Sequence, residues 1–283
     1  MSLAAPAKIN LGLKITGRRP DGYHDLQSLM VPLSIGDQLS LEALDAPGAW
    51  AASCDHPDVP VGEGSLVEKA FRFAAKALGY AGGMSLALKK VIPMGAGLGG
   101  GSSDAAAVMR AVERFTGRQM PADLYSEVAY QVGADVPFFL KDGAKWVMGI
   151  GEQVRPLTKI PPLNVLLVHP GVGIATKWVY SQLKIESLTP AVPAATLPAV
   201  FESLADLVPY LANDLESVVL PASQEVREAK EALKACGADT ALMSGSGSTV
   251  YGLYSDPKKL KQAAEALKSQ RPPWWMCSCS SVG

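Results

Sequence analysis

Aliphatic side chains occupy every second position in three early segments, residues 8–15, 29–35 and 39–41. A period of two places these side chains on one face of an extended chain, so the pattern predicts β-strands. Residues 45–64 are rich in Pro, Gly and Asp and are predicted to form a loop. Another strand is predicted over residues 85–92.

Three helices are predicted between residues 65 and 132. In the first, Ser65 and Glu68 have the spacing of a capping box, and Gly79 is a typical stop. The other two run to about Phe115, before Gly117, and over residues 122–132, before Gly133. The helix that ends near Phe115 has an apolar face formed by Ala106, Met109 and Val112.

Strands near 144–150 and 153–157 are predicted to complete the first half of the chain. The second half is predicted to end in a helix–strand–strand–helix–strand order. Pro161-Pro162 marks a boundary between predicted domains 1–159 and 160–283. The elements expected after it are a strand at 165–168, helices with a Pro-rich link around 189–198, a helix at 222–235, strands at 240–244 and 249–254, a helix after Asp256-Pro257, and a strand at 274–280. This order predicts an α+β protein of mostly antiparallel sheets, whose C-terminal part is ferredoxin-like.

Composition excludes several classes of protein. Lys and Arg total 26 and Asp and Glu total 27, so the surplus of cations that nucleic-acid binding needs is missing. The sequence shows neither a run of about 18 apolar residues nor a signal-peptide pattern, so no membrane association is expected. The four cysteines are irregularly spaced and are expected to be free thiols in a reducing cytosol. The oligomeric state is not predicted.

The strongest chemical signal is a segment with five glycines in residues 95–101, between a predicted strand and a predicted helix. Glycines let backbone N–H groups approach a ligand closely, and a helix start carries partial positive charge, so this segment predicts a phosphate site. The alternative is a tight turn. Gly95, Gly97 and Gly100 also match a dinucleotide fingerprint. In that motif an acidic residue follows a second strand about 20 positions later, whereas the next predicted segment here is another helix.

Three glycine-containing or polar motifs resemble those of the GHMP kinase family. They are Pro6–Leu11, Pro93–Ala106 and Met243–Tyr251. The resemblance implies the two-domain architecture of that family and transfer of phosphate from ATP, with Mg²⁺, to a small-molecule alcohol. Asp21–His24, Gly133–Pro137 and His169–Val172 resemble the members that phosphorylate the 2-hydroxyl of a cytidylyl-linked methylerythritol in non-mevalonate isoprenoid synthesis.

The same resemblance implies roles for individual residues. Asp135 and Lys8 are the predicted catalytic pair. Asp135 is an isolated acid after a helix stop, with a helix N-cap as the alternative interpretation. Lys8 lies two positions before Asn10 and shares its strand face, with a solvated lysine as the alternative.

The remaining predicted contacts divide between nucleotide and substrate. ATP is expected at Ser65, Pro93, Gly95, Ala96, Gly97, Leu98, Gly99, Gly100, Gly101, Ser102 and Ser103, and the substrate at Asn10, Tyr23, His24, Thr176 and Tyr180. Close relatives often have Asn where this chain has Ser65, so adenine recognition is expected to rest more on backbone groups. No protein ligand of the metal is predicted.

Three alternative functions remain open from the sequence. The chain could be another kinase of the same family, acting on homoserine or mevalonate derivatives. It could be a nicotinamide-dependent dehydrogenase that uses Gly95, Gly97 and Gly100. It could also be a nucleotide-binding regulator without catalysis, which the presence of both Lys8 and Asp135 disfavours.

Overall fold

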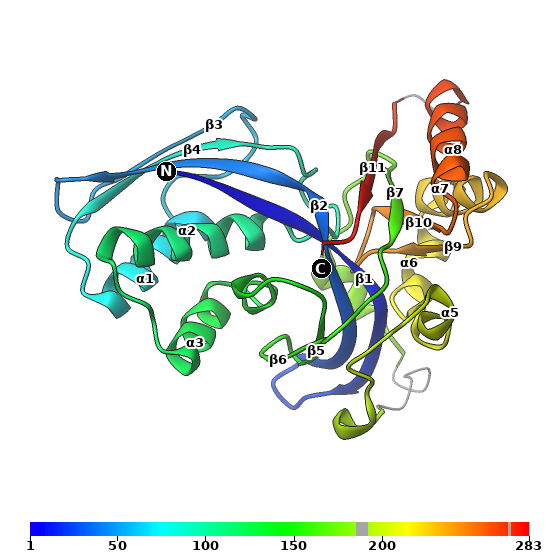
Figure 1. Cartoon of the computed structure of the whole chain (residues 1–283), viewed down its shortest axis with the longest axis horizontal. Helices are drawn as coiled ribbons and strands as arrows, with labels where there is room; N and C mark the ends of the chain where they lie inside the picture. Colours follow the sequence, from blue (N-terminus) through cyan, green and yellow to red (C-terminus); the bar gives the residue numbers. More distant parts are fainter. Residues whose placement is uncertain (185–191, 271–272, 283) are drawn as a thin grey trace. The chain divides into compact units, whose positions relative to one another are not determined.

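The computed structural model describes residues 1–184, 192–270 and 273–282, and it is an α+β protein as predicted (Figure 1). The chain forms two compact units. Unit 1 comprises residues 1–7, 35–94 and 99–141, and unit 2 comprises residues 8–34, 95–98 and 142–283. The predicted domain boundary at residue 159 stays a prediction, since the compact units are divided differently. No helix within the described ranges is long and apolar enough to cross a membrane.

Two long strands, β1 (Ser2–Arg18) and β2 (His24–Leu44), contribute residues to both units. The strands extend further than the alternation predicted, and only residues 19–23 separate them. Their aliphatic side chains, such as Ile9 and Leu29, are fully buried.

In unit 1, strand β4 (Gly83–Lys89) lies between β3 (Trp50–Cys54) and the second half of β2. It pairs with β3 in parallel and with β2 antiparallel. The prediction of a continuous loop at residues 45–64 is therefore wrong, because it contains β3. Side chains of β3 alternate only between partly buried and exposed, which left no apolar pattern to detect. The Trp50 ring stacks on Phe71, with 5.4 Å between centroids.

The described helices of unit 1 are α1 (Leu66–Leu78), α2 (Gly100–Thr116), α3 (Ala122–Val132) and the 3₁₀-helix η1 (Pro137–Leu140). Helices α1 and α2 pack against each other (Figure 1). Gly79 and Gly117 end these two helices with a left-handed φ of 64°, as predicted. Ser65 Oγ accepts the N–H of Glu68, but the Glu68 carboxylate accepts the N–H of Gly64, so only half of the capping box forms.

In unit 2, three short strands are added to the sheet that contains β1 and β2. Strand β8 (Ala212–Asn213) pairs in parallel with β1, and β5 (Lys145–Gly149) pairs antiparallel with β2 and with β6 (Gln153–Pro156).

A second sheet of unit 2 contains β7 (Asn164–His169), β9 (Thr240–Met243), β10 (Val250–Tyr254) and β11 (Trp275–Ser280). Its order is β11-β7-β10-β9, and all its pairs are antiparallel. Helices α7 (Gln224–Ala235) and α8 (Pro257–Gln270) are its crossovers. The first strand therefore lies between the last and the third, which is the predicted ferredoxin-like arrangement.

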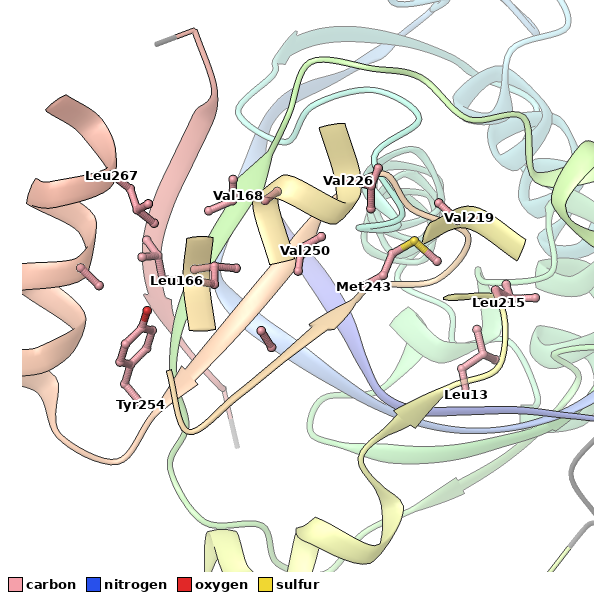
Figure 2. Packing of buried hydrophobic residues seen from close by; sticks show 14 of the residues in the cluster. Leu13, Leu166, Val168, Leu215, Val219, Val226, Met243, Val250, Tyr254 and Leu267 are labelled. Atoms are coloured by element: carbon pink, nitrogen blue, oxygen red, sulfur yellow. The ribbon is translucent and has the colours of Figure 1, made fainter. Parts of the chain in front are cut away.

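The core of unit 2 forms between this sheet and its helices (Figure 2). Leu166 and Val168 of β7 pack with Val226 of α7 and Leu267 of α8. The helix predicted at 222–235 is confirmed as α7, which begins after Ser223, whose Oγ accepts the N–H of Val226. A further helix that was not predicted, α6 (Glu216–Ala222), precedes it.

The remaining short elements of unit 2 are α4 (Thr176–Ser181), η3 (Ala194–Thr196), α5 (Leu204–Leu207) and η4 (Val208–Tyr210). Part of the predicted Pro-rich link around 189–198 lies outside the described residues.

Candidate active site

The glycine segment, residues 95–101, has the backbone geometry of an anion cradle. Gly95, Gly97 and Gly99 have φ values of +60°, +76° and +72°, which residues with a Cβ rarely adopt. A Cβ built on Gly95 would meet no atom within 4 Å, so open space lies over that position. Gly99 is the N-cap of α2 and offers no side-chain cap to the first N–H groups of the helix. These features fit a phosphate group at the start of α2.

In unit 1, the start of α2 lies near the turn that carries Asp135. A Cβ on Gly133 would lie 4.0 Å from Ser102 Oγ and 3.8 Å from the side chain of Leu66. Asp135 follows two residues later and is partly buried. The N-cap of η1 is Val136, so the interpretation of Asp135 as a helix N-cap is wrong. The structure therefore brings the predicted acid and the helix start into one unit.

In unit 2, three consecutive carbonyls of the glycine segment are held by the other two motifs. Ala96 O accepts from Thr249 N–H at 3.2 Å, and Gly97 O accepts from Ser244 Oγ at 2.9 Å. Leu98 O accepts from Lys8 N–H at 2.9 Å. The three motifs, which are far apart in the sequence, therefore meet through hydrogen bonds to these backbone carbonyls.

Lys8 belongs to a buried polar network, so its interpretation as a solvated lysine is wrong. Its residue is 3% exposed, and its Nζ donates to Asn10 Oδ1 at 2.7 Å. Asn10 Nδ2 donates in turn to Ser28 Oγ at 2.8 Å, and Ser28 Oγ donates to Gly12 O. Tyr251 Oη donates to Asn10 O from β10. Sequence reasoning missed Ser28, and it included Tyr251 only as the end of the third motif, because each lies far from residue 10 along the chain.

The third motif lies beside this network. A Cβ on Gly245 would lie 3.3 Å from Lys8 Nζ, and Gly245 O accepts from Asn213 Nδ2 at 2.8 Å. Asn213 was also missed by sequence reasoning, because no glycine or motif surrounds it. Thr176 Oγ1 and Ser246 Oγ lie 2.8 Å apart, which places the predicted substrate contact Thr176 against the same motif.

Two of the predicted substrate residues form a ring pair in unit 2. His24 and Tyr180 have centroids 5.4 Å apart and planes tilted by 41°. Burial and the positive charge of Arg18 lower the pKa of His24, which favours a neutral imidazole that can both donate and accept hydrogen bonds. Tyr23 is 61% exposed and leaves its ring face open to a ligand.

Ser65 is buried at the start of α1, in the same unit as α2. The next residue, Leu66, reaches α2, since a Cβ on Gly101 would lie 3.4 Å from it. The four cysteines are free thiols, as expected. Within the described residues, no group of three or more His, Cys, Asp or Glu side chains could hold a metal ion by itself.

Comparison with known protein families agrees with this geometry. Residues 65–143 match the GHMP kinases N terminal domain, and residues 196–272 match the GHMP kinases C terminal domain. The chain belongs to the GHMP kinase family, and it is a small-molecule kinase. The dehydrogenase alternative is not favoured, since both matched domains belong to a family of kinases.

Full-length relatives carry one particular activity in their names. The chain is 39% identical to 4-diphosphocytidyl-2-C-methyl-D-erythritol kinase of a Geobacter species, over 100% of this chain and 99% of that protein. It is also 39% identical to the same kinase of Deinococcus radiodurans, over 96% of this chain and 90% of the relative.

Solved structures give the same result. The crystal structure of a 4-(cytidine 5′-diphospho)-2C-methyl-D-erythritol kinase superposes with a TM-score of 0.83, at 34% identity and over 100% of both chains. A homoserine kinase from Cytophaga hutchinsonii superposes with a TM-score of 0.71 at 19% identity, over 100% of this chain and 94% of the other, which is a likeness of fold alone.

Proposed function

We propose that this kinase transfers the γ-phosphate of ATP to the 2-hydroxyl of 4-diphosphocytidyl-2-C-methyl-D-erythritol, giving the 2-phosphate and ADP in isoprenoid precursor synthesis. The observation that carries the proposal is the full-length 39% identity to relatives with this named activity. The uncapped start of α2 behind three left-handed glycines supports it, because that geometry suits a triphosphate.

Asp135 is proposed to orient the acceptor hydroxyl and accept its proton. Phosphoryl transfer passes through a loose transition state, so positioning of the hydroxyl is a large part of this role. Lys8 is proposed to place its positive charge beside the transferred phosphoryl group. The amide of Asn10 fixes the Lys8 ammonium at 2.7 Å, which restricts the rotamers of a long side chain before substrate binds.

The cytidine end of the substrate is proposed to lie against Tyr23, His24 and Tyr180. Aromatic faces stack on a base, and neutral imidazole hydrogen-bonds its edge. Asn10 and Thr176 are proposed as polar contacts to the methylerythritol end. Mg²⁺, when bound with ATP, neutralises phosphate charge during transfer. A cytosolic location belongs to the same proposal, because four free thiols are typical of a reducing compartment.

The test is ADP release from a panel of acceptors. Turnover is expected with the cytidylyl substrate and not with methylerythritol phosphate, homoserine or mevalonate. Comparable turnover of homoserine or mevalonate would refute the substrate assignment.

The catalytic assignment is tested with Asp135→Asn. This variant is expected to lower kcat by about 10²–10⁴-fold with an unchanged melting temperature. Asp142→Asn, at an exposed carboxylate a few residues later in the chain, is the matched control and is expected to keep its activity. A folded Asp135→Asn protein with normal turnover would contradict the assignment.

A further inference from the structure

Unit 1 contains a buried cluster of two carboxylates and one ammonium, formed by Asp37, Lys90 and Asp104. Lys90 Nζ donates to Asp104 Oδ2 at 2.8 Å and to Asp37 Oδ2. The exposed fractions of the three side chains are 0% for Asp37, 7% for Lys90 and 2% for Asp104. Such complete burial of three charges is costly unless each of them is held by hydrogen bonds.

The cluster holds the chain on both sides of the glycine segment. Asp37 Oδ1 accepts the N–H groups of Val91 at 2.6 Å and Ile92 at 2.9 Å, just before Pro93. Asp104 lies in the first turns of α2, after the last glycine. Lys90 connects the two carboxylates, so the chain that enters the segment and the helix that leaves it are fixed to one ammonium.

The Lys90 ammonium also lies next to the first residue of α2. A Cβ built on Gly100 would lie 3.2 Å from Lys90 Nζ and 3.1 Å from Ile92. Any rotation of the first turn of α2 would therefore disturb Lys90 and its two carboxylates. Because the helix begins with glycines, which have no side chains to pack, the cluster supplies the positional restraint that they lack.

The cluster has one more negative than positive charge when both carboxylates are ionised. Burial raises the pKa of Asp104 to about 7, against the opposing effect of Lys90. Asp104 Oδ1 has no hydrogen-bond partner within the described part of the chain. This arrangement suits a carboxyl group that carries a proton for part of the time.

Other charged groups around the cluster have their own partners or are exposed. Asp55 accepts the backbone N–H of Lys90 at 2.8 Å at the end of β3. On α1, Glu68 pairs with Arg72 at 3.0 Å. The positive charge that pairs with Asp104 therefore comes from Lys90 of the cluster.

We propose that Asp104 is a positioning residue, which with Lys90 and Asp37 fixes the start of α2 for the nucleotide phosphates and takes up a proton when they bind. This proposal rests on the proposed function, since it needs ATP at the glycine segment. Phosphate charge at the helix start disfavours a second ionised carboxylate nearby, so nucleotide binding and protonation of Asp104 are reciprocally coupled.

Two substitutions separate shape from charge. Asp104→Asn keeps the size of the side chain and an acceptor for Lys90, but it cannot take up a proton. Asp104→Ala removes the connection between α2 and Lys90. Asp123→Ala, at an exposed carboxylate in the first turn of α3, is the matched control.

Binding of MgATP is measured by calorimetry in two buffers of different ionisation enthalpy, at a pH near 7.5, together with KM and kcat. Wild type is expected to take up a fraction of a proton and Asp104→Asn none. The KM of Asp104→Asn for ATP is expected to stay within about threefold of wild type, and that of Asp104→Ala to rise about tenfold or more, with a smaller change in kcat.

Equal proton uptake by wild type and Asp104→Asn, with normal turnover, would overturn this proposal alone. An unchanged KM in Asp104→Ala would overturn the positioning role. If Asp104→Ala does not fold, proton uptake by Asp104→Asn decides the question. A wild-type protein that neither binds MgATP nor releases ADP would instead refute the proposed function, and this inference with it.

Discussion

A side chain at Gly97 would overlap a backbone carbonyl, so Gly97→Ala is a sharp test of the loop geometry. A Cβ at Gly97 would lie 2.1 Å from Ser244 O, whereas ordinary contact begins at 3.4 Å, so a gap of 1.3 Å must open. The φ of +76° costs an L-residue about 1–2 kcal/mol by itself. Opening the gap also strains the hydrogen bond from Ser244 Oγ to Gly97 O, which is worth about 1 kcal/mol.

Together these effects predict a loss of about 2–3 kcal/mol in the free energy of unfolding. Gly95→Ala is the matched control, because its φ of +60° is similar and its Cβ would meet nothing within 4 Å. It is expected to lose only the backbone part, about 1–2 kcal/mol. Urea denaturation of both variants, with m-values compared, measures the difference. Equal losses in the two variants would refute the close approach of Ser244 to Gly97.

The remaining predictions concern Tyr23 and Ser65. Tyr23→Ala is expected to raise KM for the cytidylyl substrate about tenfold, while kcat and the melting temperature change little. The reason is that the exposed ring stacks on the substrate in the ground state and the transition state alike. An unchanged KM in steady-state assays would remove Tyr23 from the site. Ser65→Ala is expected to cost about 1 kcal/mol in urea denaturation through loss of the α1 cap, whereas Ser65→Asn keeps a capping oxygen and should cost less. Equal stability of Ser65→Ala and wild type would show that the cap contributes nothing.

Local sequence signals predicted the elements whose cause is local. Alternation located β1 and β2, and glycines at 79 and 117 located helix ends, because both signals act within a few residues. Strand β3 was missed because its stability comes from pairing with β4, about 34 residues away, rather than from an apolar face.

In the candidate site, too, features with a local cause could be predicted and features that depend on distant residues could not. Backbone freedom is visible in sequence, so the glycine segment could be predicted as a phosphate site. The roles of Asp135 and Lys8 came from resemblance to the family, and they remain predictions. Ser28 and Asn213 could not be predicted, since an isolated polar residue on a strand has many solvated alternatives.

A loop made of glycines gains access to a ligand and loses rigidity, because glycine has the largest backbone entropy to lose on ordering. The restraint must therefore come from residues outside the loop. In unit 2, donors from Lys8, Ser244 and Thr249 hold three successive carbonyls. In unit 1, Asp37 and Asp104 hold the flanking chain through Lys90. None of these residues is a glycine. Substitutions that remove the Ser244 hydroxyl or a charged group of Asp37, Lys90 or Asp104 are therefore expected to loosen the segment while every glycine stays in place.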